Sequence, residues 1–252
     1  MEIVDLECIV MSCGEPTFEK CVESIKLQTY QPAKMSVIQN VSPINESINA
    51  RHAAMKLPFS VKVDADMVLY SDCFEIMYEK LKSLSLSHYA VTALLNDPYI
   101  GSMGAVHMER TEAVKEIHVP CIIGCDRYVR NRKKKQNEYI WEMSNVVGEH
   151  WCNWSVESVF KRHLRVGQKL AYYKGQHYGD WIKEIGDKWY TDDSDDAFIA
   201  LLGICHGLMT HDDKEKGVDF ADKEWQRVKM LIEKGVIPEP TLKLQKMLEE
   251  EK

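Results

Sequence analysis

The sequence predicts an α/β fold in which a mostly parallel central sheet is flanked by helices. Short apolar runs rich in β-branched residues alternate with amphipathic helical segments through residues 1–100. This alternation is typical of parallel strands that are covered on both faces. Hydrophobic residues make up 45% of the chain and charged residues 28%, and its 252 residues are enough to bury a sizeable core.

The elements of the first half can be placed in order from these patterns. Apolar residues at helical spacing identify the amphipathic helices, and Asp72 and Glu75 have the spacing of a capping box at the start of one of them. We expect strands at 7–13, 33–40, 59–69 and 88–95, and helices at 17–28, 46–57 and 72–84.

The second half of the sequence is less regular. A strand at 101–110 and a short helix at 111–117 precede a stretch, 119–147, that has no assignable pattern. Beyond it we expect a helix at 155–164, a strand that leaves into a loop at 168–181, and helices at 222–234 and 240–252. Because no linker or repeat interrupts the chain, we expect a single domain over 1–220, with halves at 1–100 and 101–220, and a helical C-terminal appendage at 221–252.

Charge and composition argue against several classes of protein. The formal net charge is −7, so the chain as a whole would not be drawn to nucleic acid or to an anionic membrane. No stretch approaches the roughly 18 unbroken apolar residues of a membrane span, and the N-terminal run carries acids instead of the basic start of a signal peptide. The eight cysteines are scattered, several of them in apolar runs. We therefore expect a reduced, cytoplasmic protein.

Two aspartates stand in the middle of an apolar run, FSVKVDADMVLY. Buried carboxylates are costly unless they are compensated, and Asp64 and Asp66 lie near the carboxyl end of the predicted strand, where ligands of open α/β sheets bind. Residues two apart on a strand point the same way, so both carboxylates can converge on one cation. The glycine-rich signatures GxxxxGK[ST] and GxGxxG are absent. We therefore expect Mn²⁺ or Mg²⁺, bridging these carboxylates to a nucleotide diphosphate.

Residues 1–100 resemble the nucleotide-binding half of family 2 glycosyltransferases with the GT-A fold, a Rossmann-like arrangement. The similarity is carried by the QTYQP element at Gln28–Pro32, the ARH element that contains Arg51, and the D-x-D strand, in this order. The resemblance implies a metal-dependent hexosyltransferase-like enzyme. It would move a sugar from a nucleotide-diphosphate donor to an acceptor hydroxyl with inversion.

The resemblance also implies roles for donor-side residues. Asp66 would coordinate the metal, and Asp64 would contact the ribose or the metal shell. Cys13, Glu15 and Asn40 would flank the nucleobase, and Arg51 would belong to the same donor site. The family usually has an acidic D-D-G-S turn after the second strand, whereas this chain has Gln39, Asn40, Val41 and Ser42.

The acceptor side needs a carboxylate that takes the proton of the acceptor hydroxyl. The family places this base in an E-D element, which is similar to Glu157 and Ser158 here, and Glu149 is the competing candidate. The resemblance further implies that His177, beyond the last core strand, completes the metal shell.

Two alternative functions stay open. Ser158 in place of aspartate and the altered turn are compatible with a nucleotide-sugar binding module that has no transfer activity. The basic run at 127–135 is usual for a solvated loop, but it would also suit an anionic acceptor, such as a phosphorylated lipid, an acidic glycan or modified bases in DNA.

Overall fold

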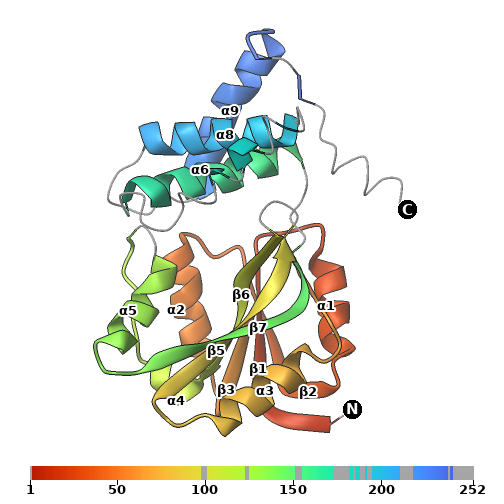
Figure 1. Cartoon of the computed structure of the whole chain (residues 1–252), viewed down its shortest axis with the longest axis vertical. Helices are drawn as coiled ribbons and strands as arrows, with labels where there is room; N and C mark the ends of the chain where they lie inside the picture. Colours follow the sequence, from red (N-terminus) through yellow and green to blue (C-terminus); the bar gives the residue numbers. More distant parts are fainter. Residues whose placement is uncertain are drawn as a thin grey trace. The chain divides into compact units, whose positions relative to one another are not determined.

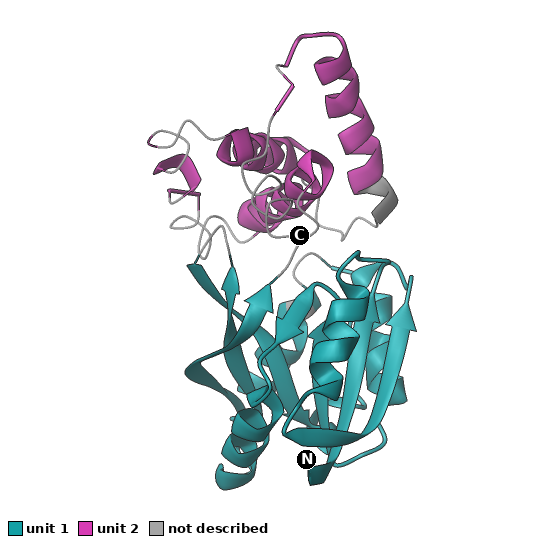
Figure 2. Cartoon of the chain, turned by 90° about the vertical axis from the view of Figure 1, so that its right-hand side faces the viewer, with its two compact units in different colours: residues 1–152 teal, residues 153–252 magenta. Residues whose placement is uncertain are grey.

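The computed structural model describes residues 2–97, 101–122, 125–150, 155–172, 182–183, 185–187, 191, 195–210, 218–237 and 239–240. It divides the chain into two compact units, Met1–Cys152 and Asn153–Lys252 (Figure 2). The sequence places the boundary at residue 220 instead, so the division of the chain differs from the expected one.

The first unit contains a seven-stranded sheet (Figure 1). Its order is β2-β1-β3-β6-β5-β7-β4. From the pairings, β1, β2, β3, β5 and β7 run in one direction, and β4 and β6 run in the other. The mostly parallel sheet that the sequence predicts is therefore confirmed. The strands are β1 Glu2–Ser12, β2 Tyr30–Gln39, β3 Phe59–Asp64, β4 Met67–Leu69, β5 His88–Asp97, β6 Gly101–Arg110 and β7 Tyr139–His150.

Helices cover both faces of this sheet, as alternation along β1 shows. Cys8 and Val10 belong to one hydrophobic cluster, whereas Ile9 and Met11 belong to the other. The first cluster includes residues of α1 and α3, and the second includes residues of α2, α4 and α5. These helices are α1 Phe18–Lys26, α2 Ile44–Ala54, α3 Cys73–Ser83, α4 Thr111–Val114 and α5 Tyr128–Lys134.

The strand predicted at 59–69 is interrupted, and this break shapes the sheet. β3 ends at Asp64, and β4 begins at Met67 and pairs with β7 at the far end of the strand order. The Cα atoms of Asp64 and Met67 can be at most about 11 Å apart, because only three peptide links join them. The sheet must therefore curl so that its last strands return beside β3. Asp64 thus ends a strand and Asp66 lies in a turn, so the expectation that one continuous strand aligns both is wrong.

Two local expectations in the first unit also change. The capping box at Asp72 does not form, since α3 has no side-chain cap hydrogen bond, and Glu75 accepts a hydrogen bond of 2.7 Å from the Thr29 hydroxyl instead. The unassigned stretch 119–147 contains α5, a short 3₁₀ helix at Cys125–Arg127 and most of β7. β7 has no clean apolar alternation because most of its residues before Val147 are exposed.

The second unit is helical in its described part, with α6 Val156–Tyr172, α8 Asp195–Met209 and α9 Val218–Glu233. α8 approaches α6 closely: a Cβ atom on Gly207 would lie 2.0 Å from the Leu164 carbonyl oxygen. The Phe160 ring of α6 lies 5.7 Å from the Trp225 ring of α9. Because α9 packs on α6, residues 221–237 belong with the helices before them instead of forming a separate appendage.

The strand predicted at 168–181 is wrong where the structure describes it. Residues 168–172 continue α6, because the helical spacing of buried residues set by Phe160, His163 and Leu164 runs on through Gly167 and Gln168. Residues 173–181 and 241–252, the latter expected to be helical, lie outside the described residues. In the part of the chain that the structure describes, no helix is both long and apolar enough to cross a membrane.

Candidate functional site

The five strands that run in the same direction bring their carboxyl ends to one edge of the sheet. The last residues of these strands are Ser12, Gln39, Asp64, Asp97 and His150. In open α/β sheets, ligands bind outside this edge. All five residues carry polar or ionisable groups of the kind that hold a metal or a polar ligand, so this edge is the candidate site.

The loops after β1 and β2 form one side of the site. The Glu15 carboxylate accepts hydrogen bonds from the Ser12 hydroxyl at 2.8 Å and from the Cys13 amide at 2.9 Å. The Asn40 amide donates to the Ser12 carbonyl at 2.9 Å, and Asn40 adopts a positive φ of 55° that asparagine tolerates. The structure therefore brings Cys13, Glu15 and Asn40 together, and Cys13 and Asn40 are exposed.

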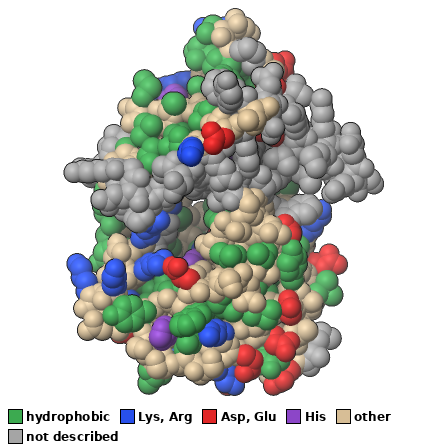
Figure 3. Space-filling view, viewed as in Figure 1, with side chains coloured by type: hydrophobic (Ala, Val, Ile, Leu, Met, Phe, Trp, Pro, Cys, Tyr) green, Lys and Arg blue, Asp and Glu red, His purple; other side chains and the backbone are tan. Residues whose placement is uncertain are grey.

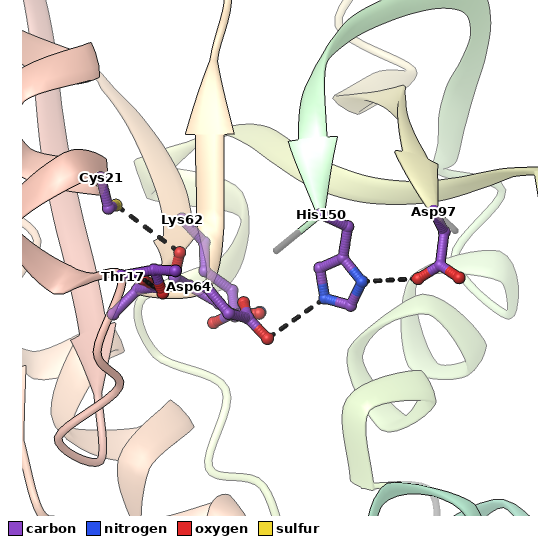
Figure 4. A network of polar contacts seen from close by, with 8 residues as sticks. Thr17, Cys21, Lys62, Asp64, Asp97 and His150 are labelled. Atoms are coloured by element: carbon purple, nitrogen blue, oxygen red, sulfur yellow. Dashed lines mark hydrogen bonds and ion pairs between the residues drawn. The ribbon is translucent and has the colours of Figure 1, made fainter. Parts of the chain in front are cut away.

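The turn that contains the two aspartates is held by its backbone (Figure 4). The Ala65 carbonyl accepts a hydrogen bond of 2.8 Å from the Thr17 hydroxyl, and the Ala65 amide donates to the Met11 carbonyl at 2.9 Å. The Cys21 thiol donates to the Asp64 carbonyl at 3.6 Å. Burial, followed by the Asp66 and Asp64 charges, raises the pKa of Cys21 to about 12, so this cysteine stays a neutral thiol. The end of β1 and the start of α1 thus fix the turn.

The side chain of Asp66 faces a histidine that sequence reasoning did not select. His150 Nε2 lies 3.2 Å from Asp66 Oδ2, and His150 Nδ1 lies 2.7 Å from Asp97 Oδ2 (Figure 4). The Asp97 side chain has no exposed surface and that of His150 is 10% exposed. If Nδ1 carries the proton and donates to Asp97, Nε2 is presented towards Asp66. This is how a carboxylate orients a metal-binding imidazole.

These residues fit a divalent cation that arrives with further ligands. Among the residues that the structure describes, no group of three or more His, Cys, Asp or Glu side chains is arranged to hold a metal ion. Magnesium and manganese, however, are commonly bound through one or two carboxylates, with phosphate oxygens and water in the other positions. Asp64, Asp66 and the Nε2 atom of His150 can supply the protein part of such a shell.

Glu149, one of the two candidate bases, is not brought to this turn. The Glu149 carboxylate accepts hydrogen bonds from the Tyr70 hydroxyl and, at 3.0 Å, from Asn96. The bond to Glu149 is the main cause that raises the pKa of Tyr70. Since successive side chains of a strand point to opposite faces, Glu149 faces away from the side on which His150 meets Asp66.

The other candidate base, Glu157, lies on α6 in the second unit. It pairs with Lys161, which also pairs with Asp222 of α9. Ser158, where the resemblance expects an aspartate, lies in the first turn of α6. Its backbone N–H donates to the hydroxyl of Ser155, which caps the helix, and its own hydroxyl accepts from the Ser155 N–H. His177, expected to complete the metal shell, lies outside the described residues.

Arg51 is held inside the first unit. Its Nη1 atom lies 2.6 Å from Glu109 Oε2, and its Nη2 atom lies 3.2 Å from His52 Nε2. Arg51 is 4% exposed. The structure thus engages the guanidinium with β6 and does not bring it to the aspartate turn.

Asp97 and His150 could be found from the sequence by one signal only, their place at strand ends. Asp97 follows a predicted strand by two residues, so the rule that sites lie at carboxyl ends applies to it. His150 ends a strand that the sequence does not reveal. Its pairing with Met67 across the curled sheet is what brings it to Asp66.

Replacing Asp97 with asparagine tests the orienting role of this buried carboxylate. We expect D97N to weaken Mn²⁺ binding in the presence of nucleotide diphosphate by about 10- to 100-fold, because an amide can present its N–H to Nδ1 and favour the wrong tautomer. Isothermal titration calorimetry measures this affinity. E149Q, altered at the residue next to His150 but on the opposite face, is the matched control. An unchanged affinity in folded D97N would mean that Asp97 does not orient a metal ligand.

No family model matches the sequence, and no curated protein matches it. Solved structures do match. The mannosyltransferase PcManGT from Pyrobaculum calidifontis, in complex with GDP-Man and Mn²⁺, is 10% identical with a TM-score of 0.52, over 90% of this chain and 80% of that chain. TarS residues 1–349 from S. aureus match with 11% identity and a TM-score of 0.49, over 82% of this chain and 89% of that chain. The first match confirms the predicted GT-A type of fold; at this identity it carries no more than the fold.

Proposed function

We propose that this protein is a metal-dependent glycosyltransferase that moves a sugar from a nucleotide-diphosphate donor to an acceptor hydroxyl. The single observation that carries the proposal is the turn at the carboxyl edge of the sheet, where Asp64 and Asp66 lie together and Asp66 faces the buried pair of His150 and Asp97. Paired carboxylates backed by an oriented imidazole suit a cation that carries a diphosphate.

Each residue of this edge has a proposed role. Asp66 and His150 hold the cation, Mn²⁺ or Mg²⁺, and Asp97 orients His150. Asp64 completes the protein part of the metal shell or contacts the ribose. When bound, the cation would act as a Lewis acid that neutralises the departing diphosphate.

The nucleobase would lie against the loops after β1 and β2. Glu15 is fixed by Ser12 and Cys13, and Asn40 is tied to Ser12, so the polar groups that would meet a base edge are pre-organised. Asn40 is exposed and carries both a donor and an acceptor, which suits hydrogen bonding to a base. Arg51 would contribute to the nucleobase side of the site only indirectly, by stabilising the fold, since its ion pair with Glu109 joins α2 to β6.

Inverting transfer requires a general base on the acceptor side. Glu157 and Glu149 are the two candidates, and they differ in surroundings: Glu157 is paired with Lys161, whereas Glu149 accepts from Tyr70 and Asn96. Replacing the true base by glutamine would stop transfer and leave metal-dependent binding of the nucleotide intact. Replacing the other would change neither.

A nucleotide-sugar binding module without transfer is the second candidate function. It is favoured by Ser158, which stands where an aspartate base would be needed and whose hydroxyl is engaged with the Ser155 backbone at the start of α6. The two functions share the donor site and differ only in turnover.

Exposed basic side chains at α5 favour an anionic acceptor for the proposed transferase. Arg132, Lys134 and Lys135 are exposed, and Figure 3 shows Lys and Arg side chains gathered over α5. Arg130 and Lys133, by contrast, are paired with Glu142 and Glu138. An acceptor panel should therefore include phosphorylated and acidic glycans, lipid-linked phosphates and a DNA duplex that carries modified bases.

The experiment that tests the proposal is the release of nucleoside diphosphate from UDP- and GDP-sugars over this acceptor panel, with Mn²⁺ and with a chelator. Metal-dependent release with at least one donor is the expected result. Metal-dependent binding with no release and no transfer would leave the binding module, and no metal-dependent binding at all would contradict both.

A further inference from the structure

The carboxylate of Asp64 forms an ion pair with the ammonium group of Lys62. Lys62 Nζ lies 2.5 Å from Asp64 Oδ2 (Figure 4). Both residues belong to β3 and are two apart, so their side chains leave the same face of the strand. The Lys62 side chain is 24% exposed and that of Asp64 is 36% exposed, so solvent and ligands can reach the pair.

The ionisable side chains on the neighbouring strand β6 do not compete with Asp64 for the Lys62 ammonium group. His107 lies opposite Lys62 on β6. Burial, followed by the Lys62 charge, lowers the pKa of His107 to about 4, so this histidine is neutral near pH 7. Glu109, the next acid along that face, is engaged by Arg51 at 2.6 Å. Within the described residues, Asp64 is the ion-pair partner of Lys62.

We infer that Lys62 is a built-in counter-ion of the metal site. It neutralises Asp64 until a metal that carries a nucleotide diphosphate displaces it, and its ammonium group then binds the diphosphate. A dication alone must approach Asp64 against the Lys62 charge, whereas a metal–diphosphate complex offers oxygens that attract the same ammonium. This inference rests on the proposed function and adds a coupling between its two ligands.

This role of Lys62 predicts that the metal and the nucleotide strengthen each other's binding. If the diphosphate relieves the repulsion between Lys62 and the metal, the nucleotide strengthens metal binding, and the metal strengthens nucleotide binding by the same factor. The wild-type protein should therefore bind Mn²⁺ weakly by itself and much more tightly with UDP or GDP. Without the Lys62 charge, metal binding should depend much less on the nucleotide.

The test compares Mn²⁺ binding to wild type, K62M and K62R, with and without UDP or GDP. The electron paramagnetic resonance signal of free Mn²⁺ reports this binding without any turnover. We expect K62M to bind Mn²⁺ alone about two- to fivefold more tightly, the range of a partly exposed ion pair, and to gain less from the nucleotide. K62R keeps the charge and should behave as wild type. Lys34→Met is the matched control, since Lys34 lies 2.5 Å from Glu7 on the same sheet, several residues before the site.

The outcomes separate the two proposals. Unchanged or weaker binding of Mn²⁺ alone by K62M, while UDP or GDP still strengthens Mn²⁺ binding by the wild type, would overturn the counter-ion role and leave the proposed function standing. If neither nucleotide strengthens Mn²⁺ binding by the wild type, the proposed function fails, and the counter-ion role fails with it.

Discussion

Replacing Asp66 with alanine is expected to abolish Mn²⁺-dependent binding of nucleoside diphosphate. Asp66 is the carboxylate that faces His150 Nε2 at 3.2 Å, so its removal takes away one of the few protein ligands available to the cation. Even residues that merely orient a metal ligand contribute about 10- to 100-fold in affinity, so the loss of a ligand should exceed about 100-fold. Titration of the protein with UDP or GDP at fixed Mn²⁺, followed by calorimetry, measures the effect.

The control for this variant is Asp72→Ala. Asp72 is an exposed aspartate of the same unit that stands at the start of α3 and makes no side-chain cap hydrogen bond there. D72A should bind the nucleotide as wild type does. If D66A bound UDP or GDP with wild-type affinity in the presence of Mn²⁺, and lost this affinity when Mn²⁺ was chelated, the metal would be bound by residues other than Asp66.

Replacing Glu109 with glutamine is expected to destabilise the first unit by about 3–5 kcal/mol, because it leaves the Arg51 guanidinium buried without its counter-charge. The two side chains are 5% and 10% exposed, and the atoms of the pair are 2.6 Å apart. Arg51 also donates towards His52, whose Nδ1 lies 2.7 Å from the Ile117 carbonyl, so the pair is part of a buried network. Urea unfolding measures the loss.

Two further variants identify the cause of this loss. Arg51→Met combined with E109Q removes both charges and should recover most of the stability. E142Q, which breaks the exposed pair with Arg130, should change the unfolding midpoint little. A double variant as unstable as E109Q alone would show that the ion pair is not the source of the stability.

The same pair makes stability depend on pH in a defined direction. Burial by itself would raise the pKa of Glu109, but the charge of Arg51 and its hydrogen bond outweigh burial and lower it below the usual value. The stabilisation is therefore complete above the pKa of an ordinary glutamate, about 4.3. It is lost as the pH falls below this value and through the lowered pKa of the folded state.

The first two strands and the first two helices could be predicted because their pattern is local. Apolar runs and helical spacing within residues 1–57 identify β1, α1, β2 and α2 without knowledge of any contact. The D-x-D turn was found for the same reason, since two acids in an apolar run stand out in the sequence alone. The break between β3 and β4 could not be predicted from the sequence, because the run FSVKVDADMVL stays apolar on both sides of Asp64 and Asp66.

The partner of Asp66 could not be predicted because it depends on pairing between distant strands. β7 is mostly exposed before Val147, so it lacks the alternation of a half-buried strand. His150 reaches the site only because Met67 pairs with it after the sheet has curled. Lys62 carries no distinguishing signal in the sequence, because a single lysine in a strand is usually a solvated side chain.

The second unit was predicted less well for a related reason. Gln168–Tyr172 ends in Leu170, Ala171 and Tyr172, in which we expect the start of a strand. In the structure they extend α6, whose preceding turns are fixed by packing against α8, including the close approach of Gly207 to the Leu164 carbonyl. Tertiary contacts thus override the local preference.

The most direct test of the metal–nucleotide site is the thermal stability of the wild-type protein against a panel of nucleoside diphosphates, each with Mn²⁺ and again with chelator. A ligand that binds only the folded protein at about a hundred times its dissociation constant adds about 2.7 kcal/mol. For a unit of this size that corresponds to a rise in melting temperature of roughly 5–10 °C. We expect such a rise for at least one nucleotide with Mn²⁺, and its loss with chelator. No Mn²⁺-dependent rise for any nucleotide would contradict the claim that Asp64 and Asp66 form a metal–nucleotide site.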